Sequence, residues 1–398
     1  MEKVVPETLG LDSERLGRIN RTMQGYVDQG QLSGAITAVA RRGEIAHAEC
    51  VGWMDLEAKK PVQLDTLYPI FSMTKPITSA ALMMLYEEGH FHLFDPVSRF
   101  IPEFKDVQVY VGTVDETPEL IDSEREITIH DLLTHTAGLV SDFWLDPTLT
   151  KLAQEVGLFQ PDLTLEEFAK RLSTLPLIHQ PGAAWRYGEA YEVVARLVEV
   201  ISNQPFGAFL KQRILQPLGM HNTGFGIPEG QQDRLVKYYG FSETGGLVEK
   251  LEENPRWRPS SIPMGGIGLV STASDYMRFA QMLLNGGELD GVRLLGRKTV
   301  QYMTRNHLPQ DLLPMQVAPG WELPGWGYGF GFSVLMDATQ SKVLGSEGLY
   351  FWDGIEGTWF WVDPMEKLIG LIMLRMEPWT WMPICYTFQV LTYQAIVD

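Results

Sequence analysis

FSMTKPIT, residues 71–78, places a serine and a lysine three positions apart at the start of an apolar run that continues to Glu88. Three residues are just under one helical turn, so the Ser72 hydroxyl and the Lys75 amine project from the same face of a helix. A serine hydroxyl is a poor nucleophile at neutral pH unless an adjacent group takes its proton. The spacing alone also fits an N-capping serine followed by an exposed lysine. The pair predicts an acylation site only if other motifs support it.

The surroundings of Ser72 favour a reactive position. A strand-like apolar approach, 67–71, leads into a helix predicted over 76–88. Free amides at a helix N-terminus stabilise developing negative charge. Pro76 cannot donate an amide, but the cost is small in the first helical turn. Ser72 is therefore expected at the start of this helix.

A second motif is Trp-Arg-Tyr-Gly-Glu, residues 185–189, between a Gln-Pro-Gly turn and a helix predicted from Ala190. A tyrosine on such a loop, near a cationic lysine, can have its proton affinity lowered enough to shuttle a proton. Tyr187 is thus a candidate acid or base. Taken alone, the motif also fits a packed aromatic residue with a hydrated hydroxyl.

The third motif is Trp-Asp-Gly-Ile, residues 352–355, near the end of a predicted strand. Gly354 would let a substrate approach the strand edge closely, and an amide at that edge could complete an oxyanion hole with the amide of Ser72. An ordinary hairpin turn is the alternative interpretation.

Composition narrows the possible functions. The 398 residues carry 32 Lys and Arg against 50 Asp and Glu, a formal charge of −18 that disfavours nucleic acid as a partner. No apolar run approaches a membrane span, and residues 1–10 lack a secretory signal, so we expect a cytoplasmic protein. Cys50 and Cys385 are expected as free thiols, and no Cys and His cluster implies a metal or other cofactor.

The pattern of elements changes along the chain. Residues 33–53 read as a hairpin, and four runs (327–335, 342–351, 358–363 and 368–374) read as consecutive antiparallel strands. Helical periodicity marks both ends, 13–27 and 387–397, and the middle, at 76–88, 129–133, 165–172, 190–201 and 206–214. Segments 107–123 and 309–324 are expected as long surface loops. One sheet assembled from the two chain ends, with a helical region inserted, accounts for this order.

Together, the three motifs resemble those of the serine β-lactamase and penicillin-binding-protein superfamily, and most closely the family VIII carboxylesterases, which look like class C β-lactamases. The resemblance covers nearly the whole chain. Its other stretches are ITIHDLLTHTAGL (127–139), QPLGM (216–220), GGIGLVSTASD (265–275) and GTWFWVDP (357–364). It implies an α+β fold with an antiparallel sheet flanked by terminal helices. We expect an α/β domain from 1–71 and 265–398, a mainly helical domain from 72–264, and the active site between them.

The resemblance also assigns roles. Ser72 would be the acylated nucleophile, Lys75 and Tyr187 the proton-handling pair, and the amides of Ser72 and Ile355 the oxyanion hole. Which of Lys75 and Tyr187 is the base stays open, because both groups ordinarily have a pKa near 10.

Two departures bear on substrate binding. Trp352 replaces the lysine of the K-T-G motif, and Glu189 replaces the asparagine that ends the tyrosine motif of class C enzymes. Loss of that lysine removes an ion pair with a carboxylated substrate, and Trp352 offers an apolar wall instead. Glu189 would add negative charge near the place of an anionic substrate. Both changes favour neutral esters.

We therefore expect a serine carboxylesterase that hydrolyses short- to medium-chain esters through an acyl-enzyme. The alternatives are a class C-like β-lactamase or D-alanyl peptidase, an acyltransferase to an alcohol acceptor, and a catalytically silent binding protein of this fold. The chain contains no G-x-S-x-G pentapeptide, so an α/β-hydrolase nucleophile is absent. Neither Ser141-Asp142-Phe143 nor Ser274-Asp275-Tyr276 completes an S-D-N motif, and His135 is expected in a structural role. The oligomeric state, monomer or dimer, stays open.

Overall fold

The two ends of the chain build the main sheet of the protein. The computed structural model describes residues 1–115, 117–140, 146–254, 256, 258–260, 262–318 and 320–398, so Ser141-Asp142-Phe143 lies outside the described residues. Eight antiparallel strands follow the order β15-β16-β17-β18-β19-β1-β2-β3. They are β1 (Gly34–Arg41), β2 (Glu44–Asp55), β3 (Lys60–Pro61), β15 (Trp326–Tyr328), β16 (Ser333–Leu335), β17 (Tyr350–Asp353), β18 (Trp359–Asp363) and β19 (Leu368–Met373).

The central pair of this sheet joins the N-terminal hairpin to the last strand. Ile36 of β1 lies opposite Met373 of β19, and Arg41 lies opposite Leu368. All residues of both strands are buried, which fits their nearly unbroken run of small and β-branched apolar side chains. The prediction of one sheet from the two chain ends is confirmed. The run 327–335, read as one strand, contains two.

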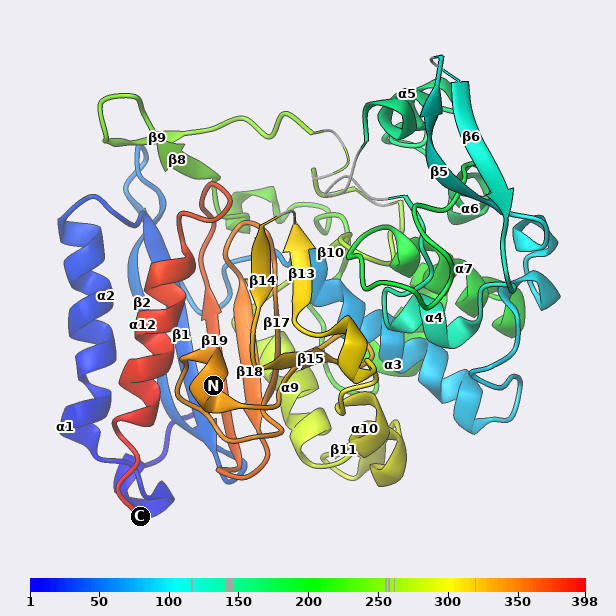
Figure 1. Cartoon of the computed structure of the whole chain (residues 1–398). Helices are drawn as coiled ribbons and strands as arrows, with labels where there is room; N and C mark the ends of the chain where they lie inside the picture. Colours follow the sequence, from blue (N-terminus) through cyan, green and yellow to red (C-terminus); the bar gives the residue numbers. More distant parts are fainter. Residues whose placement is uncertain (116, 141–145, 255, 257, 261, 319) are drawn as a thin grey trace.

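Helices cover both faces of the sheet (Figure 1). On one face, α1 (Ser13–Leu16), α2 (Arg18–Asp28) and α12 (Met382–Tyr393) pack together, with α2 against β2 and α12 against β19. On the other, α9 (Ala273–Leu284) packs against β18 and β19. The two terminal helices therefore flank the sheet as expected, whereas α9 and the nearby α10 (Arg297–Met303) were not anticipated.

The middle of the chain is mainly helical. Its helices are α3 (Thr74–Glu87), α4 (Ile129–Leu133), α5 (Pro147–Glu155), α6 (Leu165–Leu172), α7 (Ala190–Ser202) and α8 (Phe206–Leu210), the last continuing into a π-helical turn, Lys211–Leu215. Helix α3 is buried from Thr74 to Leu85 and packs against α7 and α8. A helix that is apolar on all sides belongs inside a protein. Helix α3, which begins just after Ser72, therefore lies in the interior of the molecule.

Two segments expected as loops contain strands. Residues 107–123 hold a hairpin of β5 (Gln108–Val114) and β6 (Thr117–Asp122), and residues 309–324 hold β13 (Met315–Ala318) and β14 (Trp321–Leu323). The expectation rested on their Pro, Gly and acidic residues. Gly112 and Pro118 nevertheless lie inside the paired strands β5 and β6, because a two-stranded ribbon has only edge strands, which tolerate both residue types. Short strands β4 (Tyr68–Pro69), β7 (Gly224–Phe225) and β10 (Leu269–Ser271) form a small sheet beside α3.

Taken together, the antiparallel sheet, its terminal helices and the inserted helical region confirm the expected α+β architecture. The exact domain boundaries, after residues 71 and 264, stay a prediction. Cys50 and Cys385 are both free thiols. Within the described residues, no helix combines the length and the apolar character needed to cross a bilayer.

Candidate active site

Ser72 lies in a 3₁₀ turn, Phe71–Met73, that leads directly into α3. The preceding residue, Phe71, adopts a left-handed backbone conformation with a φ of 43°. For a bulky aromatic residue this conformation is strained, and such strain persists only where the surroundings impose it. Here the Tyr276 hydroxyl donates to the Met73 carbonyl at 2.9 Å and the Leu269 amide donates to the Thr74 hydroxyl at 3.2 Å. These bonds hold the turn that presents Ser72.

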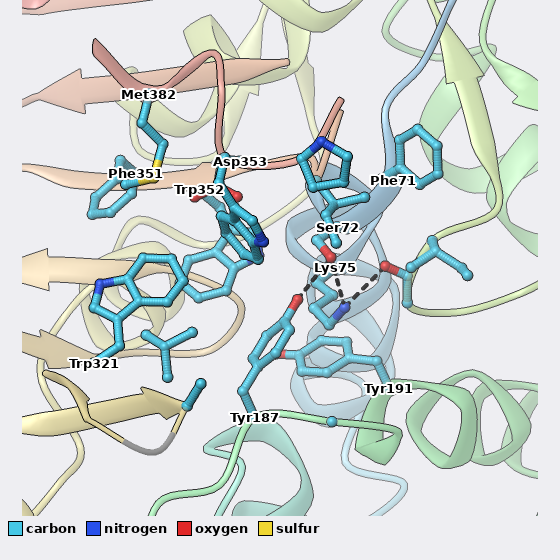
Figure 2. A pocket seen from close by; sticks show the side chains of 18 of the residues that line it. Phe71, Ser72, Lys75, Tyr187, Tyr191, Trp321, Phe351, Trp352, Asp353 and Met382 are labelled. Atoms are coloured by element: carbon cyan, nitrogen blue, oxygen red, sulfur yellow. Dashed lines mark hydrogen bonds between the residues drawn. The ribbon is translucent and has the colours of Figure 1, made fainter. Parts of the chain in front are cut away.

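The three residues singled out from the sequence meet at one atom. Lys75 Nζ lies 3.1 Å from Ser72 Oγ, and Tyr187 Oη lies 2.7 Å from the same oxygen (Figure 2). Lys75 also donates to the carbonyl of Gly266 at 3.0 Å. Ser72 and Lys75 come from the start of α3, whereas Tyr187 comes from the loop before α7. The Ser72 hydroxyl thus has an amine and a phenol, two groups that can accept or donate a proton, within hydrogen-bond reach.

Burial of Lys75 changes its acidity. Its residue exposure is only 3 %. Burial lowers the pKa of the Lys75 ammonium to about 8, although the carboxylates of Glu192, Glu189 and Asp353 act in the opposite direction. About one Lys75 in ten is therefore a neutral amine at pH 7, the form that can accept a proton.

The pKa of the Tyr187 phenol shifts upward, in the opposite direction to that of Lys75. Burial raises the pKa of its phenol above the ordinary value, and the hydrogen bond to Ser72 only partly opposes this. Tyr187 therefore stays a neutral phenol, so the sequence-based idea of a lowered proton affinity is wrong for its resting state. The physical reason is burial: neighbouring rings, including His135 at 4.6 Å and Trp352 at 5.3 Å between ring centroids, enclose the Tyr187 ring and disfavour a charged phenolate.

His135 supports the tyrosine loop. Its Nδ1 accepts a hydrogen bond from the Gly188 amide at 3.4 Å, and its carbonyl accepts one from the Arg186 amide at 2.9 Å. Burial lowers the pKa of the imidazole well below its usual value, so the ring is neutral. These contacts agree with the structural role expected for His135.

The strand edge of the third motif lies beside Ser72. Trp352 and Asp353 end β17, and Ile355 follows in the turn to β18. The amides of Ser72 and Ile355 donate to no acceptor within the described part of the chain. Both residues line the same cavity. Two free amides at one site can bind an oxyanion.

Gly354 does not have the expected part in substrate approach. It is absent from the cavity wall, and a Cβ atom there would lie 2.7 Å from the Ile70 carbonyl oxygen and 2.4 Å from Thr358 Oγ1. The glycine is required because the strand edge packs against the backbone that precedes Ser72. Gly354 therefore brings Ile355 near Ser72 and does not itself make room for a substrate.

Glu189 lines the cavity, but its charge is not free. Arg256 Nη2 lies 3.0 Å from Glu189 Oε2, and the two side chains are only 5 % and 13 % exposed. The Arg256 guanidinium also stacks over the rings of Phe159 and Phe168, at 5.3 and 5.2 Å. This buried ion pair corrects the expectation that Glu189 adds uncompensated negative charge.

The sequence reading missed Glu192 as well as Arg256. The Glu192 carboxylate accepts hydrogen bonds from the amides of Gly265 at 2.6 Å and Gly266 at 3.0 Å, and so positions the carbonyl that Lys75 contacts. Burial raises the pKa of Glu192. A Cβ atom on Gly265 would meet the Tyr191 carbonyl oxygen at 2.1 Å, so only glycine allows this close approach. The sequence signal for Glu192 was its place on the apolar face of the predicted helix 190–201, where a charged side chain is unexpected.

The cluster of Ser72, Lys75 and Tyr187 opens into an aromatic cavity of about 780 Å³. Figure 2 shows Ser72, Lys75 and Tyr187 on one side and Trp321, Phe351 and Met382 on the other. Its further apolar walls come from the β13–β14 hairpin, from β17, from the segment before α12 and from α12 itself: Val317, Leu323, Trp352, Trp379, Trp381 and Tyr386. In the described residues, no group of three or more His, Cys, Asp or Glu could hold a metal ion.

Known proteins match the chain over most of its length. The beta-lactamase family profile matches residues 19–382. Protein Rv1367c of Mycobacterium tuberculosis (strain ATCC 25618 / H37Rv) is 37% identical over 358 residues, 88% of each chain. Esterase EstB of Burkholderia gladioli is 30% identical over 395 residues, 93% of this chain and 92% of the relative.

The solved structures agree with these matches. EstCE1, described as a hydrolase with promiscuous acyltransferase activity, superimposes with a TM-score of 0.79 at 25% identity, covering 97% of this chain and 99% of that one. The resemblance to the esterase branch of the superfamily is thereby confirmed. The chain belongs to the beta-lactamase family.

Proposed function

We propose that this protein is a serine carboxylesterase that hydrolyses short- to medium-chain carboxylic esters through an acyl-enzyme on Ser72. The observation that carries the proposal is the convergence of Lys75 Nζ and Tyr187 Oη on Ser72 Oγ, at 3.1 and 2.7 Å, at the wall of an aromatic cavity. Similarity to Esterase EstB and EstCE1 supports ester hydrolysis as the reaction.

In acylation, neutral Lys75 takes the proton of Ser72 as its oxygen attacks the ester carbonyl. Lys75 is favoured over Tyr187 as the base, because burial lowers the pKa of the amine to about 8 and raises the pKa of the phenol. The amides of Ser72 and Ile355 hold the negative oxygen of the tetrahedral intermediate.

When the intermediate collapses, the bond to the alcohol oxygen breaks. Tyr187 donates its phenolic proton to this oxygen, and the proton that Lys75 took from Ser72 returns to the phenolate. Water then attacks the acyl-enzyme with the same two groups acting in reverse, which releases the acid and regenerates Ser72. Each turnover consumes one ester and one water and yields one acid and one alcohol.

Neutral esters fit the cavity better than carboxylated lactams or peptides. Trp352, 7 % exposed, takes the place of a carboxylate-binding lysine and packs its ring against Tyr187. The only cation on the wall besides Lys75, within the described residues, is Arg256, and Glu189 already pairs with it. A substrate carboxylate would therefore enter the site without a free counter-charge.

Transfer of the acyl group to an alcohol instead of water is a second candidate. EstCE1 is described as having such an activity, and a cavity of about 780 Å³ can hold an acyl chain and an acceptor together. Product analysis with added alcohols measures this partition. Ester products in excess of the free acid would make the protein a transferase.

A panel of p-nitrophenyl esters of graded length, run beside a chromogenic cephalosporin, tests the main proposal. We expect efficient turnover of short and medium esters and weak turnover of the cephalosporin. Ser72→Ala should abolish both, whereas Ser13→Ala, at an exposed position, should retain wild-type rates. Efficient cephalosporin hydrolysis with poor ester turnover would favour the β-lactamase alternative, and ester hydrolysis by Ser72→Ala would refute the acyl-enzyme.

A further inference from the structure

Asp353 is a carboxyl on the cavity wall that has no part in the proposed chemistry. It is the last residue of β17 and lies beside Trp352 (Figure 2). Within the described part of the chain, no side chain or amide donates a hydrogen bond to its carboxyl, and no cation lies within ion-pair distance. Glu189 and Glu192, the other acids of the wall, are both held by partners. Asp353 therefore lacks the partner that the fold gives to the neighbouring acids.

An unpartnered carboxylate in apolar surroundings is unfavourable. Burial raises the pKa of Asp353 to about 7, and the charge of Lys75 only partly opposes this. A cation placed in the cavity would supply the missing counter-charge and favour the ionised carboxylate. Within the described residues, the protein places no cation of its own within ion-pair distance of Asp353.

The aromatic walls suit the same kind of ligand. The rings of Trp321 and Trp379 meet edge to face, with centroids 4.7 Å apart, and the rings of Phe351, Trp352, Trp381 and Tyr386 also line the cavity. The face of an aromatic ring attracts a cation within about 6 Å, and the attraction increases when water is excluded. An aromatic enclosure with one carboxylate is the chemistry that binds quaternary and protonated amines.

We propose that the cavity selects esters carrying an organic cation, and that Asp353 is the residue that determines this selectivity. The inference rests on the proposed ester hydrolysis and names its substrate class. Asp353 precedes Ile355, the proposed oxyanion donor, by two residues, a span of at most about 7 Å of extended chain. The cation therefore lies a few bonds from the reacting carbonyl. It is bound, not transformed, and leaves unchanged on the product.

Acetylcholine and its uncharged isostere 3,3-dimethylbutyl acetate form a matched pair for the test. We expect the wild-type kcat/KM for acetylcholine to be at least tenfold higher than for the isostere. In Asp353→Asn the ratio of kcat/KM for acetylcholine to kcat/KM for the isostere should fall to within about threefold of one, whatever the absolute rates. The control Asp162→Asn, at an exposed position, should keep the wild-type ratio. A wild-type ratio near one, or an unchanged ratio in Asp353→Asn, would overturn the proposal.

The ratio should also depend on pH. It is expected to rise as pH increases through about 7, because Asp353 ionises there, whereas the ionisation of Lys75 affects both esters alike and cancels. The other titratable groups that sense Asp353 are held neutral by burial, which raises the pKa of each: Tyr187, Tyr328, Cys385 and Tyr386. A ratio that falls with rising pH contradicts the assignment.

Binding to the Ser72→Ala protein separates this proposal from the esterase itself. Choline and 3,3-dimethylbutan-1-ol are titrated while the fluorescence of the cavity tryptophans is followed. Choline should bind at least tenfold more tightly, and adding Asp353→Asn should remove the difference. Cation binding by a protein that hydrolyses neither ester would refute the esterase and keep the inference. Ester hydrolysis without any preference for a charged ester would refute the inference and keep the esterase.

Discussion

Replacing Lys75 by arginine tests whether the lysine acts as a base. Arginine keeps the positive charge and the donor groups but stays protonated at any working pH, so it cannot take the Ser72 proton. The comparison therefore separates a general base from a fixed cation. Lys298→Arg, at an exposed position, is the matched control.

The magnitude follows from the pKa of the amine. At pH 7 a group with a pKa of about 8 is neutral in about one molecule in ten, whereas a lysine with the ordinary pKa of 10.5 is neutral in about three in ten thousand. Burial thus makes the basic form roughly 300 times more available. We expect Lys75→Arg to reduce kcat/KM by about 10²- to 10⁴-fold, the usual contribution of a positioned base.

The pH profile gives the decisive readout. For a neutral p-nitrophenyl ester, wild-type kcat/KM should rise about tenfold per pH unit and level off near pH 8, and this limb should disappear in Lys75→Arg. In Asp353→Asn the limb should remain and move to lower pH, because one carboxylate that raises the pKa of Lys75 is gone. A Lys75→Arg protein within tenfold of wild type, with the same profile and melting temperature, would refute the assignment.

Three further outcomes are expected. Tyr187→Phe should lower kcat for alkyl esters by about 10²-fold. The loss should be smaller for p-nitrophenyl esters, because p-nitrophenol leaves without needing a proton. Equal losses for the two kinds of ester would exclude Tyr187 as the acid. Arg256→Met should remove the buried ion pair with Glu189 and reduce the free energy of unfolding by about 3 kcal/mol in urea titrations. An unchanged midpoint would contradict this. Burial raises the pKa of Glu356 from 4.5 to about 8, so its protonated form favours folding. Stability should therefore fall as pH rises from about 4.5 to 8, and Glu356→Gln should flatten that decline in melts across this range.

Local sequence patterns predicted that Ser72 and Lys75 lie together. The spacing of Ser72 and Lys75 depends only on helix geometry, and the contact observed at 3.1 Å follows from it. Tyr187 and Ile355 were linked to this pair by resemblance, because no local rule relates residues more than a hundred positions apart. Their convergence on Ser72 depends on the whole fold.

Contacts between residues that are far apart in the chain could not be predicted from the sequence. Glu189 looked like a free charge because its partner, Arg256, comes 67 positions later in a segment without a regular pattern. Gly354 looked like a substrate contact because a sequence does not show that the Ile70 carbonyl lies against it. The acidity of Tyr187 was misjudged for the same reason: burial by distant aromatic side chains decides it.

Mass spectrometry of the acyl-enzyme tests the central claim most directly. The protein is mixed with a p-nitrophenyl ester, quenched in acid within the first turnovers, digested and analysed for acylated peptides. The account predicts one acyl group on the Ser72 hydroxyl, absent from Ser72→Ala and released on the timescale of turnover. Turnover of the ester with no adduct on Ser72, or with the acyl group on another residue, would contradict it.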